Sequence, residues 1–160
     1  MDFPLSRDIT RIEKNFLFQS DSSFIDTQDI PMDSALKAAG WVDGQWVKTS
    51  GTTSKTLSLT DGTPVKNSFC VYTGSETLTD PTTDTKATGM LTVITSKGWI
   101  AKTKKFTGTP AIGALLVADT GNLREMVAPV ALHDFSAELP FVVAMVVGPI
   151  VDGYLEFQAL

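Results

Sequence analysis

The chain has 160 residues, of which 42% are hydrophobic and 19% are charged, and its formal net charge is −5. This length suits one ordinary domain with a sizeable core, and the hydrophobic share excludes wholesale disorder. The acidic balance argues against a general nucleic-acid binder, which needs a basic surface to neutralise phosphates.

The single cysteine, Cys70, excludes an internal disulfide. It lies in an apolar run over residues 69–72, which favours a buried thiol that acts as a small hydrophobe over a reactive or metal-binding one. The first eight residues lack the apolar run of a secretion signal, and the longest apolar stretch, residues 139–151, is too short to span a bilayer. We therefore expect a soluble protein that is made in the cytoplasm and has no membrane partner.

Residues 1–32 mix charges with scattered aromatic residues and sustain neither a helical nor a strand period. We expect an extended N-terminal arm here, followed by a single β-rich domain over residues 33–160. Four phenylalanines in a segment without a core of its own need a surface on which to lie: Phe3, Phe16, Phe18 and Phe24. That surface is either the protein's own domain or a neighbouring subunit, and the sequence leaves both open.

A short helix is predicted over residues 33–40, because Asp33 or Ser34 can cap its start and Gly40 can end it. Residues 41–47 predict a tight hairpin with Asp43 and Gly44 as its turn and a tryptophan on each flanking strand.

Residues 49–109 are rich in threonine and serine and poor in helix formers, which favours strands. Strands are predicted over residues 55–60, 67–73 and 90–95 and from residue 98 to 106, with a polar loop over residues 74–88. In the first of them Leu57 and Leu59 alternate with polar residues and are expected to point inward.

Further strands are predicted over residues 114–118, 123–127, 141–147 and 154–157, with turns at 119–122 and 152–153. The run 141–147 is continuously apolar, as expected for a strand that is covered on both faces. Short strands with turns between them, and without intervening helices, predict a mainly β fold: a small β-barrel or β-sandwich with the N-terminal arm and one short α-helix.

The residues for catalysis and metal binding are sparse. His133, the only histidine, is followed by Asp134, but neighbours in sequence rarely form the base and orienting acid of a catalytic triad. One cysteine and one histidine cannot supply the ligands of a zinc site. Asp80 and Asp84 share a polar loop without the spacing of a calcium-binding hand, so a solvated loop is favoured there. We expect no enzyme, no bound metal and no cofactor.

Two further motifs have simpler explanations. Residues 108–113 match the first half of a phosphate-binding loop, but Ala114 and Leu115 stand where lysine and serine or threonine are needed. Lys102, Lys104 and Lys105 alternate along a predicted strand. A solvated face or a protected sheet edge is favoured over contact with nucleic acid or with an acidic partner.

The C-terminal half shows a recurring pattern of turn glycines and apolar strands. Its parts are residues 98–103 (GWIAKT), 106–108 (FTG), 113–117 (GALLV), 121–123 (GNL), 142–148 (VVAMVVG) and 152–157 (DGYLEF). Over residues 90–160 this pattern resembles the small structural proteins with which tailed bacteriophages decorate or cement their capsids. Many of those proteins carry an acidic residue where Ala114 stands here.

The resemblance implies a non-enzymatic virion protein on the capsid exterior, with the major capsid protein as partner and with self-association as a dimer or trimer. Such a protein would bridge capsomers and stabilise the expanded shell. Aromatic and arginine side chains carry most interface energy, so the implied anchors lie in the arm: Phe3, Arg7, Arg11, Phe16, Phe18 and Phe24. The alternatives are another phage structural component, such as a tail, connector or fibre-base protein, or a carbohydrate-binding module.

Overall fold

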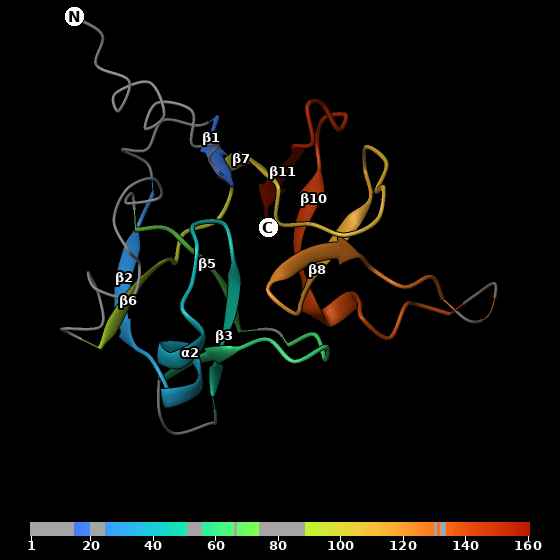
Figure 1. Cartoon of the computed structure of the whole chain (residues 1–160). Coiled ribbons are helices and arrows are strands. Elements are labelled where there is room, and N and C mark those ends of the chain that lie inside the picture. The colour runs from blue at the N-terminus through green and yellow to red at the C-terminus, as the bar shows by residue number, and fades with distance from the viewer. Residues whose placement is uncertain are drawn as a thin grey trace, which may run out of the picture.

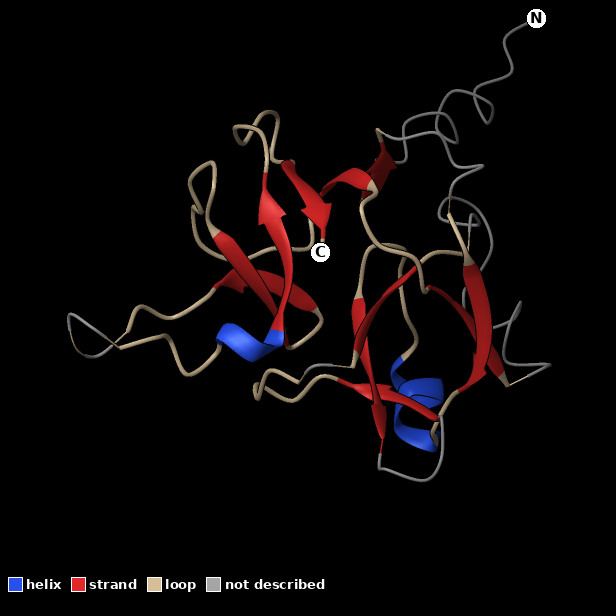
Figure 2. Cartoon of the chain, turned by 180° about the vertical axis from the view of Figure 1, so that it is seen from behind, coloured by secondary structure: helices blue, strands red, loops and turns tan. Residues whose placement is uncertain are grey.

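The structure is a computed structural model that describes residues 15–19, 25–50, 56–65, 67–73, 89–129, 131 and 134–160. Within these residues the chain forms two antiparallel sheets, neither of them a closed barrel (Figures 1 and 2). The arrangement is sandwich-like, which confirms the predicted mainly β class.

Sheet A has six strands and sheet B has five. In spatial order sheet A consists of β1 (Phe16–Phe18), β7 (Ile100–Thr103), β11 (Leu155–Ala159), β10 (Val142–Val146), β8 (Leu115–Asp119) and β9 (Asn122–Glu125). Sheet B consists of β2 (Thr27–Pro31), β6 (Met90–Ile94), β5 (Ser68–Val71), β3 (Trp46–Ser50) and β4 (Thr56–Leu59). Apart from β1, the described strands of sheet B all precede those of sheet A, and residues 95–99 connect the two.

The helix α2 (Ser34–Ala39) has the caps that the sequence predicts. Asp33 accepts a hydrogen bond from the backbone N–H of Leu36 at 2.8 Å, and Gly40, with φ of 77°, donates its N–H to the Leu36 carbonyl at 3.0 Å. The helix α2 lies beside sheet B (Figure 2). Leu36 is fully buried there and belongs to the apolar cluster on that face of the sheet. The predicted helix is confirmed.

The middle strands of sheet B are buried on both faces. One face packs on sheet A, and the other encloses a second apolar cluster with α2. Side chains at successive positions of a strand point to opposite faces, so neighbours enter different clusters. Trp46, Cys70 and Ile94 join the cluster with sheet A, whereas Val47, Val71 and Val93 join the cluster with Leu36. Cys70 is buried in the cluster with sheet A, which confirms the predicted burial of its thiol.

Two outer strands are covered by the chain itself. Along β9, Leu123 donates to the carbonyl of Lys105 and accepts from the N–H of Thr107, both at 2.9 Å. Along β4, the carbonyl of Leu57 accepts from the N–H of Asp33 at 2.9 Å, next to a bridge between Leu57 and Met32. These contacts satisfy backbone groups that would otherwise be open to pairing with another chain.

The turn between β8 and β9 joins the two sheets. Thr120 and Gly121 both have positive φ, 47° and 83°, as a two-residue hairpin turn requires. The Gly121 carbonyl accepts from the N–H of Trp46 at 3.0 Å, and its own N–H donates to the buried hydroxyl of Thr60. The predicted turn is therefore confirmed, and it also holds sheet A against β3 and the end of β4.

The structure corrects the predicted arm. Phe16–Phe18 form β1, which pairs with β7, and Thr27–Pro31 form β2, which pairs with β6. Both segments therefore belong to the sheets, and the boundary at residue 32 does not separate an arm from the domain there. Both strands lie at sheet edges. The strand β1 has only three residues and β2 buries only Ile30, so neither shows the alternation of apolar residues by which a strand is predicted.

The predicted hairpin over residues 41–47 is also wrong. Asp43 and Gly44 do form a turn, but β3 begins only at Trp46 and pairs with β4 and β5. The Asp43 carboxylate accepts from the backbone N–H and the hydroxyl of Thr73 at 2.7 and 2.9 Å, which ties the turn to the end of β5. Trp41 and Trp46 lie in different apolar clusters, so they are not cross-strand neighbours.

Replacing Asp33 tests the capping of α2. Asp33→Ala removes the acceptor for the Leu36 N–H and is expected to lower the free energy of unfolding by about 1 kcal/mol. Asp33→Asn is the matched control, because its amide oxygen can still accept that hydrogen bond. Urea unfolding followed by circular dichroism measures both, and equal stability of the alanine variant and the wild type would contradict the capping role.

Candidate interaction site

The connection from β9 to β10 carries the most exposed large apolar side chain of the described residues. Its described residues are 126–129, 131 and 134–141, and it ends in the short 3-10 helix η2 (Leu139–Phe141) just before β10 (Figure 1). Phe135 is 85% exposed, and Val127 and Leu139 are exposed as well. A phenyl ring left in water forgoes about 1.5–3 kcal/mol of burial energy, so Phe135 makes this loop a candidate for contact with another molecule.

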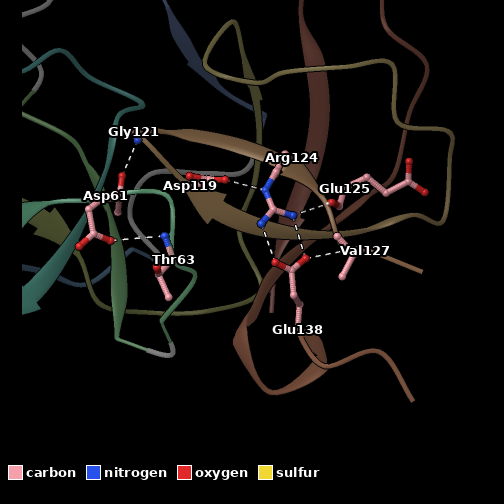
Figure 3. A network of polar contacts seen from close by, with 9 residues as sticks. Asp61, Thr63, Asp119, Gly121, Arg124, Glu125, Val127 and Glu138 are labelled. Atoms are coloured by element: carbon pink, nitrogen blue, oxygen red, sulfur yellow. Dashed lines mark hydrogen bonds and ion pairs between the residues drawn. The ribbon is translucent and has the colours of Figure 1, made fainter. Parts of the chain in front are cut away.

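A three-residue ion network braces this loop (Figure 3). The guanidinium of Arg124, on β9, donates to both carboxylate oxygens of Glu138 at 2.8 and 2.5 Å and to Asp119 at 2.7 Å. Glu138 also accepts from the backbone N–H of Val127 at 2.8 Å. The two ends of the loop are therefore tied to one another and to the β8–β9 hairpin.

The side chains of this network are partly shielded from water, which strengthens the attraction between their charges. The bidentate contact with Arg124 holds the pKa of Glu138 below its usual value, and the hydrogen bond from Val127 acts in the same direction. The same contact raises the pKa of Arg124, so the pair is charged throughout the ordinary pH range. A bidentate arginine–carboxylate pair also fixes the relative orientation of the two groups, and so it positions the start of η2.

A second group of exposed apolar residues lies at the other end of β10. Gly113 donates its N–H to the carbonyl of Val146 at 2.8 Å, which places the loop over residues 106–114 beside the hairpin that joins β10 and β11. Ile112 on that loop is 63% exposed, and Ile150 and Val151 on the hairpin are exposed as well. Sheet A therefore presents apolar side chains on loops at both of its ends.

The structure places only two of the six predicted anchors. Phe16 is 3% exposed and packs edge to face against Phe18 and Trp99, and Phe18 packs against Tyr72. Phe16 is a core residue and has no surface to offer a partner, so its prediction as an interface anchor is corrected. Although Phe16 lies on an edge strand, its ring also contacts Tyr72 and Phe157 in the apolar cluster between the sheets. Phe18 remains partly buried beside it.

The other predicted anchors, Phe3, Arg7, Arg11 and Phe24, lie outside the described residues, as do His133, Asp80 and Asp84. Within the described part of the chain, no three histidine, cysteine, aspartate or glutamate side chains come together as a metal site. None of its helices is long and apolar enough to cross a membrane.

The three lysines on and just after β7, Lys102, Lys104 and Lys105, are half-buried. Lys102 lies 3.9 Å from Glu156, and the ammonium of Lys104 lies 4.9 Å from the centre of the Tyr154 ring. These contacts fit the solvated face that the sequence favours. The alternative of a protected edge is wrong, because β7 lies inside sheet A between β1 and β11.

No protein-family model, curated protein or solved structure matches the chain.

The sequence contained part of the signal for the ion network. Once the turn at Thr120 and Gly121 is predicted, Asp119 and Arg124 are expected on adjoining strands with opposite charges, near enough to interact. Glu138 could not be assigned in the same way, since an irregular connection separates it from β9. The exposed Phe135 lies in that same connection, where no period distinguishes an inward from an outward side chain.

Phe16→Ala separates a core role from an interface role. Loss of a fully buried phenylalanine is expected to lower the free energy of unfolding by about 3–5 kcal/mol, measured by thermal or urea unfolding. Leu17→Ala on the same strand, a half-buried position outside both apolar clusters, is the control and should cost much less. A Phe16→Ala variant as stable as wild type would contradict the packing described here.

Glu138→Gln tests the ion network. The variant keeps the shape but loses the charge, and we expect a loss of about 1.5 kcal/mol of stability at pH 7. Because the folded-state pKa of Glu138 is lowered, its contribution is complete above the unfolded value near 4.5 and disappears as pH falls through the folded value. The difference between wild type and variant, from urea unfolding at several pH values, should therefore shrink below pH 4.5. Glu125→Gln, an exposed neighbour on β9, should show no such difference.

Proposed function

We propose that this chain is a non-enzymatic structural protein of a tailed-phage virion, which binds the outer capsid surface and stabilises it by bridging capsomers. The observation that carries a binding role is Phe135, 85% exposed on a loop whose ends are held by Arg124 and Glu138. The capsid as its partner follows from the resemblance of residues 90–160 to decoration proteins.

A braced loop is a favourable place for an interface anchor. Association costs free energy when loops and side chains must be ordered, and a loop already held by hydrogen bonds avoids part of that cost. Aromatic side chains are prominent among the residues that dominate binding energy. Phe135 combines both features, since its loop is tied to β9 through Arg124 and to Val127 through Glu138.

Bridging needs more than one contact surface, and sheet A offers two. Phe135 lies on the loop before β10, whereas Ile112 and Val151 lie beyond its other end. Two apolar surfaces on one stiff sheet support the simultaneous binding of two neighbouring subunits. On a repeating lattice such contacts add by multivalency, so that weak single contacts give a stable complex.

The same surfaces also fit a tail, connector or fibre-base protein, and the location in the virion separates these from a capsid role. A carbohydrate-binding module draws less support, because Trp41 and Trp46 are both buried and so do not form an exposed aromatic platform for a sugar. Self-association as a dimer or trimer on the capsid remains part of the proposal. Contacts of Phe3, Arg7, Arg11 and Phe24 with the capsid are also part of the proposal.

A deletion that tests whether the N-terminal residues bind the capsid must leave β1 and β2 in place. Deletion of residues 2–30 would remove β1 and most of β2 and would damage both sheets. Deletion of residues 2–14 removes Phe3, Arg7 and Arg11 while β1 and β2 stay in place. Unchanged capsid binding by this shorter deletion would remove those three residues from the proposed interface.

The central test is co-sedimentation of the purified protein with expanded capsids, and with unexpanded proheads, of the phage that encodes it. We expect binding to expanded capsids only, and a loss of at least about tenfold in affinity for Phe135→Ser, as for an interface anchor. Met90→Ser, an exposed apolar residue of sheet B, is the matched control and should bind as wild type. Binding to isolated tails instead of capsids, or full binding by Phe135→Ser, would contradict the proposal.

A further inference from the structure

The strand β2 is an open edge of sheet B (Figure 1). On its inner side it pairs with β6 over its whole length. No described strand lies on its outer side, whereas the outer edges at β4 and β9 are covered by other segments of the chain. All residues of β2 except Ile30 are exposed, and the other open edge, β1, is shorter. The strand β2 is therefore the longest edge of the described sheets that another molecule can reach.

The hydrogen bonds at the two ends of β2 show which of its backbone groups point outward. Thr95 donates its N–H to the Asp26 carbonyl and Met32 donates to the Gly89 carbonyl, both at 2.9 Å. Along an antiparallel pair, residues that bond to the neighbouring strand alternate with residues whose N–H and C=O point away from it. The even-numbered residues of β2 therefore bond to β6. The backbone groups of the odd-numbered residues point away from it: Thr27, Asp29 and Pro31.

These outward groups form one side of an incomplete hydrogen-bond ladder. Thr27 and Asp29 each offer an N–H and a C=O, whereas Pro31 offers only a C=O because proline lacks the N–H. None of these groups bonds to another described residue. Such a row of groups accepts an extended polypeptide as an additional strand, and the main-chain hydrogen bonds supply the affinity.

The charge of the edge indicates which polypeptide it accepts. Asp29 is the only charged residue of β2. Its carboxylate accepts from the Thr92 hydroxyl at 2.5 Å, and no described lysine or arginine forms an ion pair with it. Lys37, beside Gly89, and Lys97, which follows Ser96, lie beyond the two ends of the strand. An added strand therefore meets a negative charge at the middle of the edge, where an opposite charge stabilises pairing and a like charge opposes it.

We propose that the outer edge of β2 binds an extended segment of another protein, which carries a lysine or arginine opposite Asp29. A second copy of this chain is a poorer partner, because antiparallel self-pairing along the whole strand sets two Asp29 carboxylates opposite each other. The site lies on sheet B, away from the loop of Phe135. Binding there does not depend on the proposed capsid role.

The probe is a short blocked peptide of alternating valine and threonine with lysine at its centre, titrated in two-dimensional NMR. We expect saturable shifts and slower hydrogen exchange of the Thr27 and Asp29 N–H groups, because these groups would donate to the peptide. A peptide with methionine in place of the lysine should bind about two- to fivefold more weakly, the range of an exposed charge pair. Glutamate at that place should weaken binding further. Methylation of the backbone nitrogens of the lysine peptide keeps its charge but removes its donors, and should abolish binding.

Two variants separate the ladder from the charge. Thr27→Pro removes one outward N–H and is tolerated on an edge strand. We expect an unchanged unfolding midpoint and about fivefold weaker binding of the lysine peptide, the effect of one hydrogen bond. Asp29→Asn keeps an acceptor for the Thr92 hydroxyl. It should lower the affinity for the lysine peptide to that for the methionine peptide, which itself stays unchanged. Asp152→Asn, at an exposed acid on the β10–β11 hairpin, is the matched control and should bind as wild type.

Four results would overturn the proposal. They are the absence of saturable shifts at Thr27 and Asp29, equal affinities for the lysine and glutamate peptides, full binding by the methylated peptide, and self-association of the wild type that Thr27→Pro abolishes. The last result would show that the edge takes a second copy of this chain instead of a basic segment of another protein.

Discussion

The burial of both faces of β3, β5 and β6 is the constraint on which the rest of the structure depends. These strands are shared by two apolar clusters, so neighbouring residues are buried on opposite faces, as Trp46 and Val47 show on β3. A one-residue slip of any of these strands would exchange the two sets of side chains and leave large residues in the wrong cluster. The register of sheet B, the position of α2 and the contact with sheet A are therefore coupled.

This coupling explains where the exposed apolar residues lie. The covering of β9 by residues 105–107 and of β4 by Asp33 occupies two outer edges, and the sheet interiors are filled. Phe135 and Ile112 thus remain on loops at the ends of sheet A, where the internal packing makes no demand on them. The ion network of Arg124 extends the rigidity of the β8–β9 hairpin into one of those loops, and this makes an irregular segment suitable for recognition.

Much of the local structure could be predicted. The caps at Asp33 and Gly40 marked the helix, and the glycine turns marked the hairpins of sheet A, because these signals act through backbone groups a few residues apart. The strands β1 and β2 were missed because edge strands need little apolar pattern. The partner of Arg124 was missed for another reason: Glu138 reaches it only after an irregular connection, and no spacing rule describes such a path.

The sequence by itself determined the mainly β class, the helix over residues 34–39 and the scarcity of catalytic residue types, since these follow from composition and short-range chemistry. Only the tertiary structure decided that β6 and β7, five residues apart, enter different sheets. It also decided that Phe16 seals a core whereas Phe135 faces solvent. The physical reason is that an apolar side chain has the same intrinsic preference for burial wherever it stands. Whether the side chain is buried depends on which strands, distant in sequence, pack against it.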